Sequence, residues 1–217
     1  MATKGTGRKA PKMEQEVLTE TFEDQLATGA VCEAVAAEMR LPSLRSPRGQ
    51  SIRMNQCLWR GVTVLDPEAR RLHVQDCRIE SCDLANMDLT ESRLERVEIV
   101  STRLTGVIFA DVKFKSVLFQ ECKLDFAVMR MAKMQQCVFE RCNLTDADFY
   151  EVDLSGTDFR GCDLSRTDIA YTKLAGADIR DCRLDGMRGV PADTNGLIIS
   201  PDQAALLITL FGVRVAW

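Results

Sequence analysis

The sequence predicts an all-β chain wound into a square coil, a quadrilateral parallel β-helix with a short helix near its C-terminal end. Large apolar residues recur every five positions from Ile79 to Leu184, and a compact residue stands two positions before almost every one of them. Every twentieth of these central residues from Leu84 onward is leucine. A repeat with a fixed period determines the architecture of the whole chain.

A period of five matches neither an α-helix nor a flat strand. Two inward residues separated by one outward residue make a short strand, and the remaining two residues turn the chain. Four sides and four corners then close a coil of twenty residues, so like residues stack on like residues. Parallel coils lie ~4.8 Å apart, and six of them make a rod of ~30 Å.

Several segments carry a family signature. The runs ADF at 147–149, VDLSG at 152–156 and CDLSR at 162–166 resemble the A(D/N)LXX unit of the pentapeptide repeat family. The resemblance covers at least residues 72–186 and implies a right-handed quadrilateral β-helix. Some members of the family protect DNA gyrase and topoisomerase IV from quinolones and other poisons by mimicking DNA. Several members dimerise through their C-terminal ends.

We expect four segments along the chain. Residues 1–12 are predicted to be a disordered basic tail, and residues 13–51 an N-terminal extension that is partly helical or irregular. The β-helix is expected over 52–186, regular from about 72. Pro67 and Ala69 interrupt the pattern, so a small bulge or loop that preserves the register is expected at 65–71. Residues 187–217 hold a linker, a capping or dimerisation helix at 201–211 that stops at Gly212, and a short tail.

Composition narrows the classes of function. The formal net charge of −4 is nearly balanced, so direct nucleic-acid binding is not expected. The chain has neither a membrane-spanning run nor a secretory signal, which together with its many cysteines predicts a reducing, cytoplasmic setting. Most of the cysteines fall in the compact inward slot, so we expect free core thiols with no disulfide, metal or cofactor.

The sequence shows no catalytic constellation. The single histidine, His73, points outward and has no partner at a defined spacing. Successive aspartates from 83 onward lie on different sides of the coil, so they do not converge as an acid and a base. A binding or structural protein is therefore predicted rather than an enzyme.

The sequence offers two candidate surfaces for binding a partner. The resemblance implies a DNA mimic that binds a type II topoisomerase (DNA gyrase) and protects it from quinolone-like or natural-product inhibitors. Its candidate acidic residues lie in the C-terminal coils, but no continuous acidic column runs along the rod and one face is basic. These residues are Asp148, Asp158, Asp168 and Asp178.

The alternative is a scaffold that binds another protein through an apolar patch on the middle coils. The candidate contacts occupy outward slots and corners on two opposite faces. They are Ile108, Phe126, Val128, Met131, Tyr150 and Tyr171 on one face, and Leu118 and Val138 on the other. A competing explanation is that residues 13–50 fold back over one patch, anchored by Phe22 and Leu26.

The C-terminal helix has two apolar faces. Ala204, Leu207, Ile208 and Phe211 are expected to plug the open last coil, because an uncovered coil exposes strand edges and core. Leu206 and Leu210 lie outside that face, and they suit a homodimer contact. A monomer with a wider cap remains the alternative.

Overall fold

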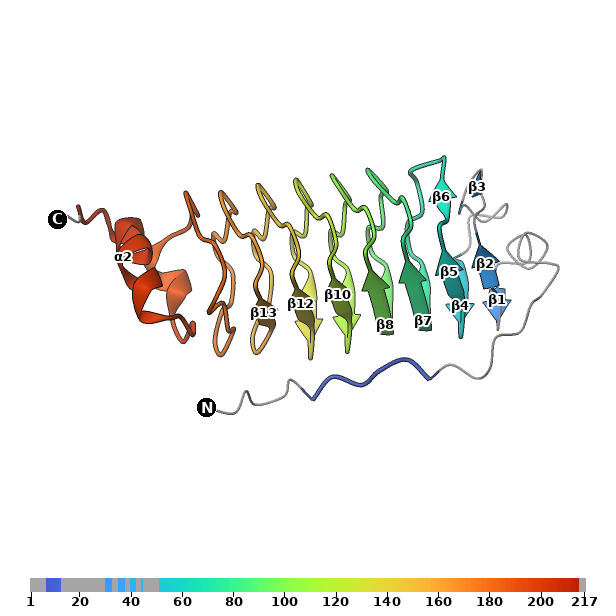
Figure 1. Ribbon diagram of the computed structural model, residues 1–217, viewed down its shortest axis with the longest axis horizontal. Coiled ribbons are helices and arrows are strands. Elements are labelled where there is room, and N and C mark those ends of the chain that lie inside the picture. Colours follow the sequence, from blue (N-terminus) through green and yellow to red (C-terminus); the bar gives the residue numbers. More distant parts are fainter. Residues whose placement is uncertain are drawn as a thin grey trace.

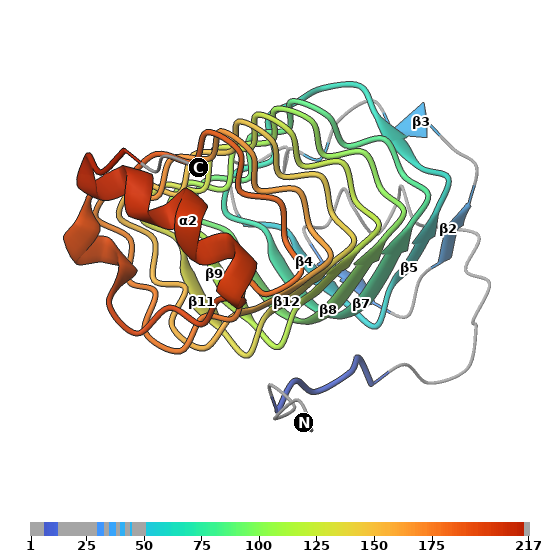
Figure 2. The same ribbon diagram turned by 60° about the vertical axis from the view of Figure 1, so that its left-hand side comes forward.

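The computed structural model describes residues 7–12, 30–32, 35–37, 40–41, 44 and 51–214 of the 217-residue chain. Its coils stack into a long rod with short helices at the C-terminal end (Figure 1). The oblique view in Figure 2 shows flat sides joined by corners, with the helices lying across the end of the rod. The predicted quadrilateral parallel β-helix with a short C-terminal helix is confirmed.

Short strands form the sides of the coils, and all of their pairings are parallel. Neighbouring coils pair twenty residues apart, so Phe119 lies opposite both Ile99 and Phe139. Many sides make only a single bridge, as between Ile108 and Val128. The strands are β1 (Ala30–Cys32), β2 (Val35–Ala37), β3 (Arg40–Leu41), β4 (Arg53–Asn55), β5 (Leu58–Arg60), β6 (Thr63–Val64), β7 (His73–Glu80), β8 (Arg93–Val100), β9 (Lys113–Lys115), β10 (Leu118–Gln120), β11 (Lys133–Gln135), β12 (Val138–Glu140) and β13 (Asp158–Arg160).

Four columns of outward residues run along the rod, one on each side of the coil, and we name each face after one member. The faces follow one another around the coil in chain order, so the Ile108 face lies opposite the Leu118 face. They are the Ile108 face (Asp88, Ile108, Val128, Asp148, Asp168), the Lys113 face (Arg53, His73, Arg93, Lys113, Lys133, Asp153, Lys173), the Leu118 face (Arg78, Glu98, Leu118, Val138, Asp158, Asp178) and the Lys123 face (Asp83, Arg103, Lys123, Asn143, Asp163, Arg183).

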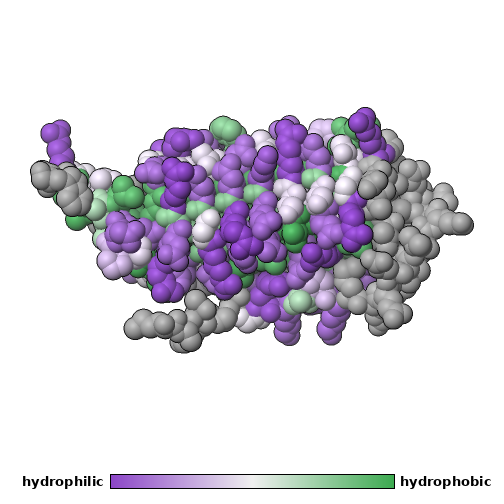
Figure 3. All heavy atoms as spheres, in the orientation of Figure 1, coloured by the Kyte–Doolittle hydropathy of each residue, from purple (hydrophilic) through white to green (hydrophobic). Residues whose placement is uncertain are grey.

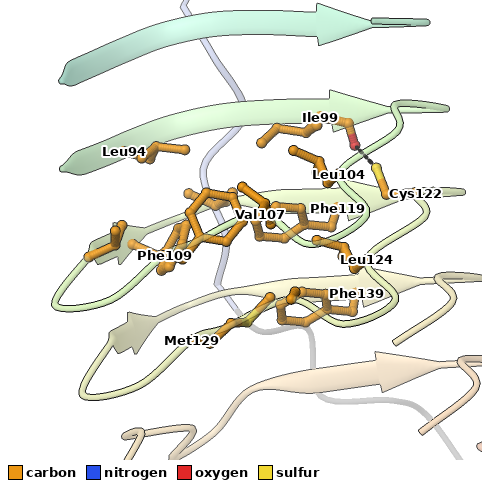
Figure 4. Packing of buried hydrophobic residues seen from close by; sticks show 14 of the residues in the cluster. Leu94, Ile99, Leu104, Val107, Phe109, Phe119, Cys122, Leu124, Met129 and Phe139 are labelled. Carbon is orange, nitrogen blue, oxygen red and sulfur yellow. Dashed lines mark hydrogen bonds between the residues drawn. The ribbon is translucent and has the colours of Figure 1, made fainter. Parts of the chain in front are cut away.

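The interior is a continuous apolar core. Leu124 and Phe139 are fully buried. The Phe139 ring stacks on that of Phe119 at 4.7 Å and on that of Phe159 at 4.9 Å. Figure 4 shows the rings of Phe119 and Phe139 with Leu104, Leu124 and Met129 filling the space between coils. Because each coil contacts mainly its two neighbours, stability is close to a sum of local terms.

The cysteines predicted for the core are buried. All eight described cysteines are free thiols inside the rod. Cys122 Sγ donates a hydrogen bond of 3.3 Å to the Ile99 carbonyl (Figure 4). Burial raises the pKa of Cys82 to about 11 and that of Cys137 to about 12, so these thiols stay protonated at neutral pH. They act as small neutral fillers of the inward slot.

Each corner is closed by two local devices. The residue two positions after the central apolar residue has a left-handed backbone conformation at most corners, as in Asn86 (φ 59°) and Gln136 (φ 55°). An aspartate or asparagine in the outward slot accepts a hydrogen bond from the backbone N–H two residues on. Asp148 Oδ1 accepts from Tyr150 N at 2.9 Å, and Asn143 Oδ1 from Thr145 N at 3.0 Å. This turn explains why the outward slot so often holds aspartate.

The N-terminal part of the rod differs from the expectation. Strands β1 to β3 precede residue 52 and pair in parallel with β4 to β6, so coil structure already begins at Ala30. The offset here is 23 residues, since Ala30 lies opposite Arg53, and a count by fives and twenties misses it. The register is kept through 65–71, as expected. Glu68 stays in register with Asp88, and Ala69 points inward.

Residues 7–12 form a strap along one corner of the rod, where a disordered tail was predicted. Lys12 N donates to Asp76 Oδ1 at 2.9 Å, and Gln56 Nε2 donates to the Lys12 carbonyl at 3.2 Å. Arg8 Nη2 pairs with Glu98 Oε1 at 3.1 Å. Both views show the strap beside the coils (Figures 1 and 2). Residues 13–29, with the predicted helix and its Phe22 and Leu26, lie outside the described residues.

The C-terminal end is capped by η1 (Pro191–Thr194), η2 (Pro201–Gln203), α2 (Ala204–Leu207) and η3 (Ile208–Phe211), ending at Gly212 (φ 71°). Gln203 Nε2 donates to the carbonyls of Ile179 (2.9 Å) and Cys182 (2.8 Å), so these two carbonyl groups of the last coil have a hydrogen-bond donor. The predicted plug is wrong for Ala204 and Ile208, which are exposed, whereas Leu207 is buried. No helix in the described part of the chain has both the length and the apolar character needed to cross a membrane.

Candidate protein-binding surface

An apolar patch lies on and beside the Ile108 face, as the sequence predicted. Ile108 and Val128 are half-buried neighbours in its column. The corner residues on either side are more exposed, with 59% of Phe126 and 45% of Met131 open to solvent. Phe126, Val128 and Met131 belong to a single coil, so the patch crosses the face from one corner to the other.

The corner residues of this patch have a backbone conformation that is unfavourable for bulky side chains. Phe126, Met131 and Tyr171 all have left-handed backbones, with φ between 58° and 59°. A bulky side chain is rare in this conformation, because its Cβ crowds the following carbonyl. At the corner that holds Phe126, other coils use glycine or polar residues, as at Gly106, Asp146 and Gly186. Large, exposed apolar groups at strained positions indicate a contact surface rather than a structural need.

The outward residues of the patch also lack a hydrogen bond that stabilises the turn elsewhere on this face. Asp88, Asp148 and Asp168 on the same face each accept a hydrogen bond from the N–H two residues on. Ile108 and Val128 have no acceptor side chain and make no such bond. Two coils in the middle of the rod therefore exchange a local hydrogen bond for a half-exposed apolar side chain.

The C-terminal edge of the patch is polar as well as aromatic. The Tyr150 and Tyr171 rings meet edge to face at 5.4 Å, and 62% of Tyr171 is exposed. The Arg130 guanidinium lies 5.7 Å from the centre of the Tyr150 ring and pairs with Asp148 at 2.6 Å. Sequence reasoning missed Arg130, although it stands directly before Met131 and one coil before Tyr150.

The opposite patch is not available as predicted. Val138 is only 4% exposed, and Leu118 is half-buried. The Leu118 face receives the Arg8 guanidinium at Glu98, and Gly7 lies against the side chain of Gln136 at the adjoining corner. The strap therefore lies along this side of the rod, and the expected cover by residues 13–50 falls mostly outside the described residues. The prediction that Val138 is an exposed contact is wrong.

The acidic candidates are largely engaged within the rod. Asp148 pairs with Arg130, Asp158 with Arg160 at 2.8 Å and Asp178 with Arg180 at 2.6 Å. The hydrogen bond from Arg180 holds the pKa of Asp178 below its usual range. Asp168 Oδ1 accepts a hydrogen bond from Ala170 N at 3.0 Å. These carboxylates serve turns and ion pairs and do not form a free acidic column.

The C-terminal end holds a second apolar surface. An open cavity of about 500 Å³ lies among Leu197, Ile199, Leu207, Ile208 and Val213. Leu206 is 45% exposed, and the side chain of Leu210 lies outside the described residues. In Figure 3 apolar side chains gather at this end of the rod.

We expect Phe126→Gly to leave the free energy of unfolding within about 1 kcal/mol of the wild type, because glycine relieves the strain at φ 59°. Phe139→Ala serves as the contrast, since it opens a cavity in the ring stack and should cost ~3–5 kcal/mol. Urea denaturation followed by circular dichroism measures both. A large loss of stability for Phe126→Gly would show that Phe126 stabilises the corner and is not simply an exposed residue available to a partner.

A comparison with protein-family models agrees with this architecture. A family model described as "Pentapeptide repeat region" matches residues 52–128 and 132–199. A search of curated proteins found no match. Among solved structures, a trypsin-treated form of QnrB1, a plasmid-mediated fluoroquinolone resistance protein, is 17% identical, with 87% of this chain and 92% of that chain covered and a TM-score of 0.46. HetL, involved in heterocyst differentiation regulation in Nostoc sp. strain PCC 7120, is 14% identical over 73% and 84% of the two chains, with a TM-score of 0.37.

Rfr23 from the cyanobacterium Cyanothece 51142 is also 14% identical, over 63% of this chain and 93% of that chain, with a TM-score of 0.31. The family model carries the assignment, because it matches more than half of the chain and its two matched regions fall on the coils described above. The chain therefore belongs to the pentapeptide repeat family.

Proposed function

We propose that this chain is a non-catalytic binding protein whose rod captures a partner protein through the Ile108 face. One observation carries the proposal. Phe126 and Met131 are exposed at strained corners of the coil whose outward slot holds Val128 instead of the turn-forming aspartate. Such a surface costs stability in the free protein, and contact with an apolar partner surface offsets that cost.

The patch also indicates the chemistry of the partner. Its centre is aliphatic and aromatic, and its C-terminal edge holds the Arg130–Asp148 pair and the Tyr150 ring. Interfaces commonly combine an apolar centre with a polar rim. A partner with an apolar ridge, flanked by groups that hydrogen-bond to Arg130, fits this surface.

The double variant Ile108→Asp and Val128→Asp should abolish partner capture without unfolding the rod. The slot already accepts aspartate at Asp88 and Asp148, and each new carboxylate gains a backbone N–H to bind. The measurement is quantitative pull-down of wild-type and variant protein from lysate of the encoding species. Lys123→Asp is the control, because it changes the net charge equally on another face. Identical partner profiles for all three proteins would contradict the proposal.

A second candidate function is binding to a type II topoisomerase as a DNA mimic, with protection against an inhibitor. It is favoured by the acidic residues of the C-terminal coils, where Asp148 stacks on Asp168 and Asp158 on Asp178. The engagement of Asp148, Asp158 and Asp178 by arginine weakens the acidic field, so we rank this function second.

A gyrase supercoiling assay with a quinolone separates the two functions. If the rod mimics DNA, it should restore supercoiling at low salt and lose that effect as salt rises. Asp148→Asn with Asp168→Asn should weaken the protection, while Ile108→Asp with Val128→Asp should leave it intact. Protection that survives high salt, or that needs Val128, would exclude the mimic.

We also propose that two copies associate through the C-terminal end. The cavity beside Leu207 and the exposed Leu206 and Ile208 form an apolar surface that a second copy would cover. Light scattering at micromolar concentration should give a dimer mass for the wild type and a monomer mass for Leu206→Glu. A monomeric wild type would support the wider cap instead.

A further inference from the structure

The Lys113 face carries an unbroken column of basic residues. Through β4, β7, β8, β9 and β11, five consecutive coils place a basic residue directly opposite the next one. The column consists of Arg53, His73, Arg93, Lys113 and Lys133. All five side chains are exposed. With coils ~4.8 Å apart, the column spans ~19 Å along the rod.

These charges are not compensated within the described residues. Arg53, Arg93, Lys113 and Lys133 make no ion pair there, whereas neighbouring cations do. Lys115 pairs with Glu95 at 3.1 Å, and Arg96 pairs with Asp76 at 2.6 Å. Like charges directly opposite each other on paired strands destabilise a sheet. Partial burial, together with Arg93 and Arg53, lowers the pKa of His73.

The fold itself does not require basic residues in this column. Asp153 occupies the next position after Lys133, and its carboxylate accepts a hydrogen bond from Ser155 N at 3.2 Å. An aspartate is therefore accepted in this slot, although Lys113 and Lys133 lie in strands β9 and β11, where the turn seen at Asp153 does not form. The column gives up the favourable pairing of opposite charges, which indicates a ligand.

Two of the carboxylates near the column are neutralised by other cations, whereas Asp111, at the corner before Lys113, makes no ion pair within the described residues. Glu95 is held by Lys115 and Arg96, and Glu98 is held by Arg78 and by Arg8 of the strap. The positive field of the column therefore reaches solvent without cancellation from these neighbours. A cavity of about 230 Å³ lies between the row of Arg93, Lys113 and Lys133 and the row of Glu95, Lys115 and Gln135.

The surroundings of the column favour one class of anion. No outward slot of this face holds an apolar residue between Arg53 and Lys133, and protein interfaces usually have an apolar centre. The column is one side chain wide, so it suits a linear polymer better than a membrane surface. Asn55, Gln75 and Gln135 beside it are residue types that donate to phosphate oxygens.

We propose that the Lys113 face binds the phosphate backbone of nucleic acid without reading its sequence. The near-neutral charge of the whole chain argued against this activity, but that charge averages over faces of opposite character. The site is separate from the apolar patch, although the two faces share the corner that holds Met131.

The test is fluorescence anisotropy with a labelled 20-base-pair duplex and the full chain, starting at 50 mM salt. If all four permanent cations contact phosphates, the logarithm of the binding constant should fall with the logarithm of salt at a slope of about −3.6. Lys113→Glu with Lys133→Glu should weaken binding at least tenfold at 50 mM salt. Lys113→Gln with Lys133→Gln should reduce the magnitude of the slope by about 2.

Arg103→Glu with Lys123→Glu on the opposite face is the matched control, with the same charge change and the same spacing of one coil. It should weaken binding less than threefold. Circular dichroism confirms that each variant is folded. The proposal is overturned by no duplex binding at 50 mM salt, by equal losses in both double glutamate variants, or by retention of poly-glutamate or anionic vesicles in preference to the duplex.

Discussion

The hydrogen bonds between successive coils are the constraint on which the rest of the rod depends. Lys123 N donates to the Thr102 carbonyl at 3.1 Å, and Leu124 N donates to the Asn143 carbonyl at 2.7 Å, so each side is tied to the coil before and the coil after. A register shift of one residue would turn every inward side chain to solvent. The ladder therefore requires an apolar residue at each central position, a compact residue two before it and a left-handed backbone at most corners. The choice of residue is freer only in the outward slots and at the corners.

That freedom makes the surface informative. Where no partner acts, the outward slot is best filled by aspartate or asparagine, because the side chain closes the corner by binding the N–H two residues on, as Asp163 does with Ser165. The corner residue is best glycine or asparagine, because φ is positive there. Val128 departs from the first preference, and Phe126 and Met131 depart from the second, all within one coil. On the adjoining face, Lys113 and Lys133 place like charges directly opposite each other. These departures weaken local structure, so interaction with other molecules is the simplest reason for them.

The regular coils could be predicted from the sequence because the ladder acts on residue type at fixed spacing. The burial of Leu124, Phe139 and the cysteines follows from that period alone. The first coil was missed because its offset of 23 residues from the next coil breaks the count by twenties. Within that coil Val31 and Leu41 are ten residues apart, so they still fit the repeat of five. The strap was missed because residues 7–12 hold no apolar period. Their placement depends on a long-range pair, Arg8 with Glu98, which no local pattern encodes. The exposed corner residues were predicted from their positions in the repeat. The missing turn at the neighbouring outward slots became visible only in the hydrogen bonds.

Net charge is a poor guide to what a solenoid binds, because each face takes only one outward residue from each coil. Five substitutions at intervals of twenty can make one face cationic while the chain as a whole stays slightly acidic. Ion pairs also change the charge that each face presents. Glu95 and Glu98 are neutralised beside the basic column, and Asp148 and Asp178 are neutralised within the acidic coils. At physiological salt the field of an exposed charge falls off within about 8 Å. Acidic residues on distant faces therefore reduce the positive field of the Lys113 face only slightly. One short chain can thus present an apolar contact on one face and a phosphate-binding edge on the adjoining face.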